Sequence, residues 1–397
     1  MSRSTHRRTG SKGLAFLPRL EPLADRTVPS VTVAFANGVL TITGDDTASN
    51  VTITATAAGA FSVDPGDGTT PQTFQGVQEI DATFGSGDDT VTVDLGNMAR
   101  RSDLTLNIDA GDGANTVSVT ADSIGRAADL SVDVTAGSGD DTVTVGLGRL
   151  ARRASADVTI DAGDGANTVK ATATGVAIGA DLTTQVTTGA GADSVTVDLG
   201  NLAMRASADV TIDTGDGTNT VDVSSNSAGM RADLSLSIQG GADADTVTVD
   251  LGRIGMRASV SADIDLGNGD NVFNWTTSRI GQRAEIDFQL ATGDGADQVT
   301  VDLGRVANRV EAGLDISTGA GDDMVTLSAN QIGKRAKVDV TVDTGAGNDT
   351  VDTHTLTGRG VTIDLQDPDN PPPSNGGDDN DQGDHDHDHG HHSHHDD

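Results

Sequence analysis

The sequence "GSGDDTVTVDLG" at residues 85–96 returns as "GSGDDTVTVGLG" at 137–148, with the related "GDGANTVSVTAD" between them at 111–122. Each copy begins 26 residues after the one before it, and a glycine keeps this spacing through eleven units. Repeats with periods of 20–50 residues are typical of stacked supersecondary units. The glycines that open the units are residues 85, 111, 137, 163, 189, 215, 241, 267, 293, 319 and 345.

Each unit contains two segments with the alternating pattern of a β-strand. Counting Gly85 as position 1, Val91, Val93 and Leu95 alternate with Thr and Asp, and a second alternation covers residues 103–109. Alternation with period 2 indicates strands, and the glycine-rich stretch that opens each unit indicates a turn. We therefore predict strands at positions 6–10 and 19–25, joined by a tight turn and a longer corner.

One unit has too few aliphatic side chains to offset the entropy of ordering its backbone. The units must therefore share hydrogen bonds and apolar faces. The constant spacing favours an all-β fold, a parallel β-solenoid of eleven 26-residue rungs with a 52-residue super-period. An antiparallel meander or a series of β-sandwiches is the alternative.

Composition divides the chain into four parts. Residues 1–28 form a basic leader that we expect to be disordered, and 29–84 form an irregular β cap with a hairpin at Asn37-Gly38. The array covers 85–366. Residues 367–397 are rich in Asp and His, and we expect a disordered tail there.

The charge balance is strongly acidic, with 60 Asp and Glu against 25 Lys and Arg and a net charge of −35. This acidity disfavours nucleic acid as a partner, because phosphates would be repelled, and favours cations. No run approaches the roughly 20 apolar residues of a membrane-spanning helix. Cysteine is absent, which excludes a disulfide framework.

The 52-residue super-period is an alternation of charge. Position 5 is Asp in the first, third, fifth, seventh and ninth units and Asn in the units between them, and position 10 alternates between Asp and Thr or Ser in much the same way. Like charges directly opposite in a ladder are destabilising. We therefore interpret the alternation as a separation of stacked carboxylates.

The turns carry oxygen ligands of the kind that Ca²⁺ prefers. The same residue types are also the commonest in turns that bind no metal, so both interpretations stay open. The candidate ligands are Asp88, Asp89, Asp109, Asp112, Asn115, Asp140, Asp141, Asp161, Asp164, Asn167, Asp213, Asp216, Asn219, Asp322 and Asp323.

The tail carries a separate candidate metal site. Its histidines alternate with aspartates, and such a tract binds zinc, nickel or copper loosely through imidazole. The alternative is an acidic tail that only increases solubility. The histidines are His385, His387, His389, His391, His392, His394 and His395.

Two segments resemble known families. The "GxGxDxV" core of the units resembles half of the calcium-binding nonapeptide of RTX, or haemolysin-type, proteins, here in a divergent 26-residue form. That resemblance implies calcium as the ligand of the turns. The stretch "RLEPLADRTVPS" at residues 19–30 resembles the Leu-Glu-Pro leader of exported planctomycete surface proteins. It implies an extracellular or cell-surface location, with a cell-envelope or extracellular polymer as partner.

The array favours a structural role over an enzymatic one. All loops keep one length, and its single histidine, His354, leaves no Ser/His/Asp arrangement possible. We therefore expect a non-enzymatic structural or adhesive protein of the cell surface, stabilised by calcium.

The alternative is a ligand-binding solenoid. An arginine column at position 17 is either a solvated ladder or a face for an anionic glycan, and the Thr-x-Thr pattern of Thr90/Thr92, Thr142/Thr144 and Thr246/Thr248 resembles ice-binding faces, interrupted at Lys170 and Asp222. The column consists of Arg101, Arg153, Arg205, Arg231, Arg257, Arg283, Arg309 and Arg335.

Overall fold

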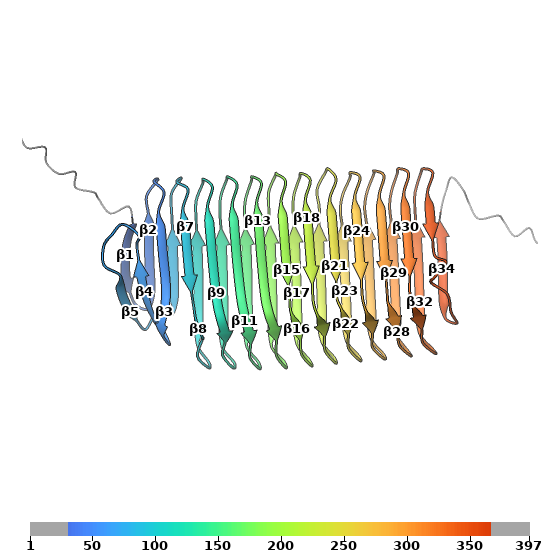
Figure 1. The fold of residues 1–397 in the computed structure, drawn as a ribbon, viewed down its shortest axis with the longest axis horizontal. Helices are drawn as coiled ribbons and strands as arrows, with labels where there is room; N and C mark the ends of the chain where they lie inside the picture. Colours follow the sequence, from blue (N-terminus) through green and yellow to red (C-terminus); the bar gives the residue numbers. More distant parts are fainter. Residues whose placement is uncertain (1–30, 367–397) are drawn as a thin grey trace, which may run out of the picture.

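A computed structural model describes residues 31–366 as an elongated, all-β rod (Figure 1). Its chain coils through about eleven turns, and consecutive turns stack in parallel, so the predicted parallel β-solenoid is confirmed. The described elements are all strands, so this part of the chain has no helix that could cross a membrane.

The first of two sheets, sheet A, has 14 strands that follow one another in chain order along the rod. It consists of β1 (Val31–Ala36), β2 (Val39–Gly44), β6 (Glu79–Thr83), β8 (Asp103–Asp109), β10 (Asp129–Thr135), β12 (Ser155–Asp161), β14 (Asp181–Thr187), β17 (Ser207–Asp213), β20 (Asp233–Gln239), β23 (Ser259–Asp265), β26 (Glu285–Ala291), β29 (Glu311–Ser317), β32 (Lys337–Asp343) and β34 (Val361–Gln366).

The second sheet, sheet B, packs against sheet A. Its main strands are β3 (Asn50–Ala57), β4 (Ala60–Asp64), β5 (Gln72–Gln75), β7 (Thr90–Asp94), β9 (Thr116–Ile124), β11 (Thr142–Leu150), β13 (Thr168–Val176), β15 (Ser194–Asp198), β18 (Thr220–Ser224), β21 (Thr246–Asp250), β24 (Val272–Thr276), β27 (Gln298–Asp302), β30 (Met324–Ser328) and β33 (Thr350–Asp352). Short continuations beside the corners are β16 (Asn201–Leu202), β19 (Ser227–Ala228), β22 (Arg253–Ile254), β25 (Arg279–Ile280), β28 (Arg305–Val306) and β31 (Gln331–Ile332).

The register places every residue of the array beside its counterpart in the next unit. Val143 pairs with Val117 on one side and with Val169 on the other, 26 residues away in each direction. In the first unit β7 and β8 cover positions 6–10 and 19–25, so both predicted strand positions are confirmed. Only the last turn is shorter, because Val338 pairs with Val361.

The first strands differ from the array. β1 and β2 form an antiparallel hairpin around Asn37-Gly38, as the sequence predicts, and β3, β4 and β5 are also antiparallel. The change to parallel pairing comes where β2 meets β6 and β3 meets β7. Antiparallel hairpins thus close the end of the rod from which the parallel coils grow.

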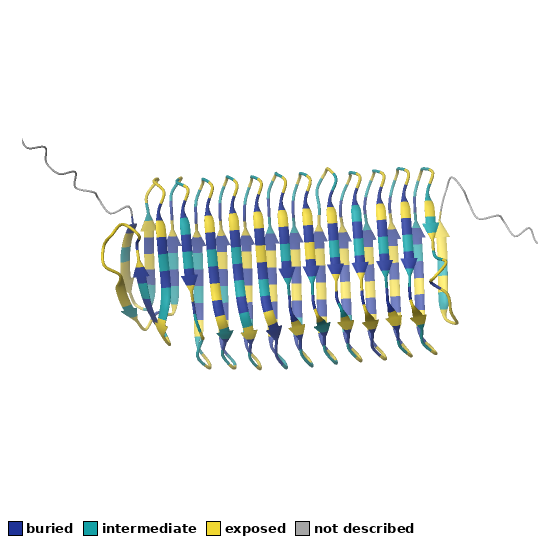
Figure 2. Cartoon of the chain, in the orientation of Figure 1, coloured by how far each residue is buried: buried dark blue, intermediate teal, exposed yellow. Residues whose placement is uncertain are grey.

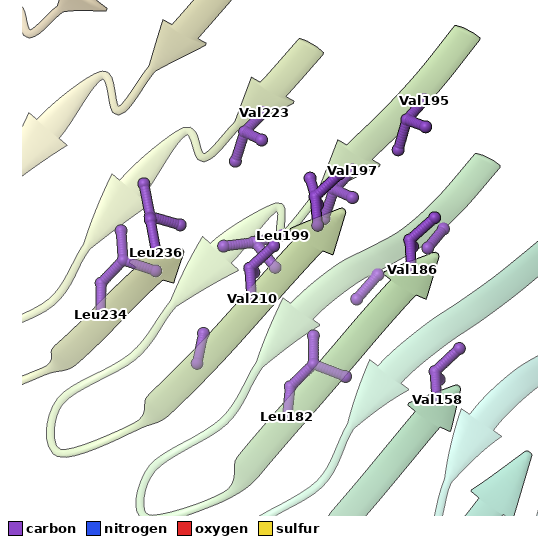
Figure 3. Close-up of a cluster of buried hydrophobic side chains, with 14 of the residues drawn as sticks. Val158, Leu182, Val186, Val195, Val197, Leu199, Val210, Val223, Leu234 and Leu236 are labelled. Carbon is purple, nitrogen blue, oxygen red and sulfur yellow. The ribbon is translucent and has the colours of Figure 1, made fainter. Parts of the chain in front are cut away.

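The core is a continuous aliphatic column between the sheets. Along each strand buried side chains alternate with exposed or half-buried ones (Figure 2). Figure 3 shows the layers in the middle of the rod, where Val197 comes from β15, Leu199 directly follows that strand and Val210 comes from β17. The only Trp, Trp275, packs edge-on against Phe288 with ring centroids 5.2 Å apart. Aliphatic residues otherwise dominate the core, as expected from a composition with 2% aromatic residues.

A substitution pair tests this inside/outside pattern. Val143 is fully buried, whereas its neighbour Thr144 points toward the outer face and is half-buried. We expect Val143→Asp to destabilise the rod by several kcal/mol, because it buries a carboxylate without a partner. Thr144→Asp should cost far less. Chemical denaturation measures both free energies of unfolding, and equal losses would contradict the assignment of faces.

Candidate functional site

Two edges of the rod collect the functional side chains. The turns at positions 1–5 lie along one long edge and the corners at positions 13–17 along the other (Figure 1). We call them the turn edge and the arginine edge. The turns need glycine because successive backbones approach closely. Gly139 has φ 133°, and a Cβ there would overlap the carbonyl oxygen of Gly113.

Position 5 forms a ladder of buried side chains inside the turn edge. Asp141 and Asn167 are each 1% exposed. The backbone N–H of one unit donates to Oδ1 of position 5 in the next unit, as from Asn115 to Asp141 (2.6 Å) and from Asp141 to Asn167 (3.0 Å). The series runs from Ser49 through Asp89, Asn115, Asp141, Asn167, Asp193, Asn219, Asp245, Asn271, Asp297 and Asp323 to Asp349.

The alternation at position 5 decides whether the second polar atom is satisfied. Asn115 donates through Nδ2 to the carbonyl oxygens of Gly111 (3.0 Å), Gly113 (3.1 Å) and Ala136 (3.0 Å). In an ionised aspartate the atom at the place of this Nδ2 donor is Oδ2, which can only accept a hydrogen bond and so cannot bond to the same carbonyl oxygens. Among the described residues, six aspartates bury Oδ2 without a hydrogen-bond partner: Asp89, Asp141, Asp193, Asp245, Asp323 and Asp349.

Burial raises the pKa of the carboxyls at position 5 from Asp89 to Asp323. It raises the pKa of Asp141, Asp245 and Asp297 to about 6, although hydrogen bonds from neighbouring amides oppose the shift. Where the alternation ends, Asp297 and Asp323 stand in consecutive units, and the charge of Asp323 raises the pKa of Asp297 further. The structure therefore supports the separation of like charges that the alternation predicts.

The remaining candidate ligands of the turns are exposed, except for the half-buried Asp213, and cap backbone amides. At positions 2 and 4, Oδ1 of Asp112 accepts from Ser138 N (3.2 Å) and Oδ1 of Asp88 from Ala114 N (2.9 Å). Asp164, Asp216, Asp140 and Asp322 make the corresponding bonds. At position 25, Asp109, Asp161 and Asp213 each accept from the amide two residues ahead.

The structure thus separates the predicted ligands into two groups. Asp89, Asp141, Asp323 and the asparagines at position 5 lie inside, and the other candidate aspartates lie at the surface or half-buried. Within residues 31–366 no three His, Asp or Glu side chains converge as a metal cluster. The histidines from His385 to His395 lie outside the described residues.

The arginine edge carries most of the positive charge of the rod. Of the 19 Arg and Lys residues in 31–366, 16 occupy corner positions 13–17 of the first ten units, where no Asp or Glu occurs. All 16 are exposed: Arg100, Arg101, Arg126, Arg149, Arg152, Arg153, Arg205, Arg231, Arg253, Arg257, Arg279, Arg283, Arg305, Arg309, Lys334 and Arg335.

The predicted Thr-x-Thr face is interrupted in the structure. Lys170 lies directly beside Thr144, and Asp222 lies beside Thr196. Asn274 breaks the pattern again beside Thr248. A flat threonine face free of charge is therefore not formed over the array, and nothing in the geometry favours ice binding.

A hollow of about 840 Å³ lies between the cap and the first corner. It opens where the link from β5 to β6 is shorter than the corners of the array. Leu95, Met98 and Leu104 contribute apolar lining, and Glu79 and Asp103 contribute charge.

Sequence reasoning missed two features of these edges. It did not separate the buried position 5 from its exposed neighbours, although position 5 is always Asp or Asn while positions 2 and 4 also accept Ala. It also missed that the arginines at position 17 adopt a left-handed backbone, with φ between 57° and 61°.

Comparison with family models, with curated proteins and with solved structures gives no match for this sequence. The function must therefore be argued from the two edges and the rod that holds them.

The buried carboxyls predict that acid stabilises the rod. A carboxyl with a pKa of about 6 when folded and about 3.9 when unfolded contributes stability that is full below pH 3.9 and is lost as the pH rises through 6. We expect Asp141→Asn, Asp245→Asn and Asp297→Asn together to raise the free energy of unfolding at pH 7.5, by up to about 3 kcal/mol for each carboxyl. Thermal melts from pH 4 to 7.5 would measure the change.

The matched control is Asp157→Asn, Asp209→Asn and Asp263→Asn, which removes the same charge from the exposed face of sheet A. This control should retain the pH dependence of the parent between pH 4 and 6, whereas the first variant should lose a large part of it, because Asp89, Asp193 and Asp323 keep their raised pKa values. If the two variants behave alike, general charge repulsion and not burial governs the response.

Proposed function

We propose that this protein is a non-enzymatic structural rod, exported and displayed at the cell surface, where it holds attached partners away from the envelope. The observation that carries the proposal is the unbroken register from β8 to β32. Each strand of sheet A in this range pairs with the strand one unit on, without an insertion. At about 4.8 Å per rung, eleven rungs give a rod about 50 Å long.

The uniform corners support a structural role. A catalytic cleft in a solenoid needs loops that differ from rung to rung, whereas here the first ten corners have equal length. The one histidine of the described residues, His354, is exposed, and its Nδ1 lies 2.8 Å from Oδ1 of Asp352. The surface location rests on the resemblance of residues 19–30 to export leaders.

Surface display predicts that protease added to intact producing cells degrades the protein. The leader should be needed, because we propose that it directs export. A variant without residues 1–28 should therefore be retained inside and protected, while keeping the β-sheet circular dichroism of the parent. Protection of the full chain on intact cells, with degradation only after lysis, would exclude the surface role.

We extend the proposal to calcium as a stabilising ligand of the turn edge. The donor chemistry fits a hard cation, because Oδ2 of Asp141 is buried without a partner beside a turn rich in carbonyl oxygens. The exposed Asp112 adds a carboxylate close enough to raise the pKa of Asp141, and the exposed Asp109 precedes the same turn. A bound cation would neutralise the orphaned oxygen, as a proton would at lower pH.

Calcium should therefore raise the melting temperature at pH 7.5, and EDTA should reverse the rise. A single independent site contributes about 2.7 kcal/mol at a hundredfold excess of ligand over Kd. Two variants locate the site. Asp109→Asn, Asp112→Asn, Asp161→Asn and Asp164→Asn together should abolish the response if it depends on the exposed acids.

The second variant, Asp89→Asn, Asp141→Asn, Asp193→Asn and Asp245→Asn together, should abolish the response if it depends on the buried ladder. Both variants remove four negative charges, so a difference between them reports location and not charge. A chain shortened before residue 367 removes any contribution of the histidine tail. If EDTA leaves the melting curve of this shortened chain unchanged, the turns bind no calcium.

A further inference from the structure

The arginine edge lacks the ion pairs that would explain it as a structural ladder. Among the described residues the only ion pair joins His354 and Asp352, so none of the 16 basic side chains forms an ion pair with a carboxylate. Like charges beside one another in a ladder are destabilising. The unpaired positive charge of this edge therefore lowers the stability of the rod when no ligand is bound.

The backbone conformation at position 17 is a second, independent observation that a structural role does not explain these arginines. Arg257, Arg283 and Arg309 have φ values of 57°, 59° and 60°, in the left-handed region that L-residues adopt at a cost of roughly 1–2 kcal/mol. Glycine occupies this position once, at Gly179, with φ 61° and no atom within 4 Å of where a Cβ would stand. The corner thus accepts glycine and gives no structural reason for arginine.

Three consecutive corners in the C-terminal half of the rod carry arginine at both position 13 and position 17. Arg253, Arg279 and Arg305 are direct partners in β22, β25 and β28. Each corner adds a second arginine four residues on, at position 17. Together Arg253, Arg257, Arg279, Arg283, Arg305 and Arg309 form two parallel columns, which we call the arginine grid.

We propose that the arginine edge binds a linear polysaccharide bearing carboxylate or sulfate groups, with the arginine grid as its main contact. Guanidinium groups bind such anions through two parallel hydrogen bonds. The rungs repeat about every 4.8 Å, a distance comparable to the advance of an extended glycan per sugar. The proposal names the partner class of the surface rod, and it rests on the proposed function for its biological setting.

The surroundings of the grid favour a glycan over nucleic acid. Asp250 and Asp302 end the strands before the corners, and Glu285 and Glu311 begin the strands after them. A DNA duplex on this edge would bring its phosphates against these acids. Single-stranded nucleic acid needs aromatic side chains for base stacking, and positions 13–17 contain none.

An apolar side chain beside the grid also fits a sugar. Met256 is 40% exposed at position 16, next to Arg257. Methionine adapts its shape to irregular apolar surfaces, such as the C–H face of a pyranose ring. The edge therefore offers both charge and apolar contact to one narrow chain.

Fluorescence anisotropy of labelled glycans with the full-length protein tests the proposal, in EDTA so that calcium does not bridge acidic groups. Alginate provides carboxylates and dextran sulfate provides sulfates, and neutral dextran serves as the uncharged comparison. We expect alginate or dextran sulfate to bind and neutral dextran not to bind. Which of the two binds more tightly identifies the anionic group.

Arg279→Gln with Arg305→Gln should weaken that binding at least about tenfold. The matched control is Lys170→Gln with Lys337→Gln, which removes the same charge from outside the corners and should change the Kd by less than about twofold. Circular dichroism and electron microscopy should show an intact rod for both variants.

Three results would overturn the proposal: equal weakening by the two variants, no binding of either charged glycan, or tighter binding of duplex DNA or phosphatidylserine vesicles than of the glycans. Each of these results leaves the surface-display test of the rod unaffected. Conversely, protection of the chain inside intact cells would remove the surface setting without changing the measured affinity for the glycan.

Discussion

Parallel stacking in exact register governs this protein, because it places every side chain beside the same position of the next unit. Val143 meets Val117 and Val169, and Arg279 meets Arg253 and Arg305. Aliphatic residues gain from this arrangement, since each adds to a continuous core. Columns of charged residues are destabilised by it, because like charges stand about one strand spacing apart and repel each other. The chemistry of the rod follows from how the chain handles these columns of identical groups.

The two edges handle like charge in opposite ways. Inside the turn edge, asparagine separates the buried carboxylates, and backbone amides bond to every Oδ1 of the ladder. At the arginine edge no asparagine-like spacer separates Arg253 from Arg279, and no carboxylate forms an ion pair with them. The first arrangement lowers the cost of the column within the free protein. The arrangement at the arginine edge leaves repulsion between stacked arginines, which a bound anion would remove. For this reason we assign the ligand to the arginine edge.

Either a proton or a calcium ion would compensate the buried carboxylate oxygens of the turns that lack a hydrogen-bond donor. Asp141 carries a buried Oδ2 without a donor, and burial raises its pKa to about 6. Below that pH a proton supplies the missing donor. Above it, a calcium ion would neutralise the charge. A rod of this kind would therefore respond to acidity and to calcium through the same ladder, with Asn115 and its equivalents insensitive to both.

The sequence by itself determined the architecture. A constant spacing of 26 and an alternation of apolar with polar residues define the strands and their inward faces, and the absence of insertions favours parallel stacking over an antiparallel order. It could not separate Asp88 from Asp89, because adjacent turn residues follow no fixed period and only the folded turn sends one side chain out and the other in. The left-handed backbone of Arg257 and the absence of an ion pair at its guanidinium also required the tertiary structure. Both depend on how one corner lies against the next, which spacing along the chain does not specify.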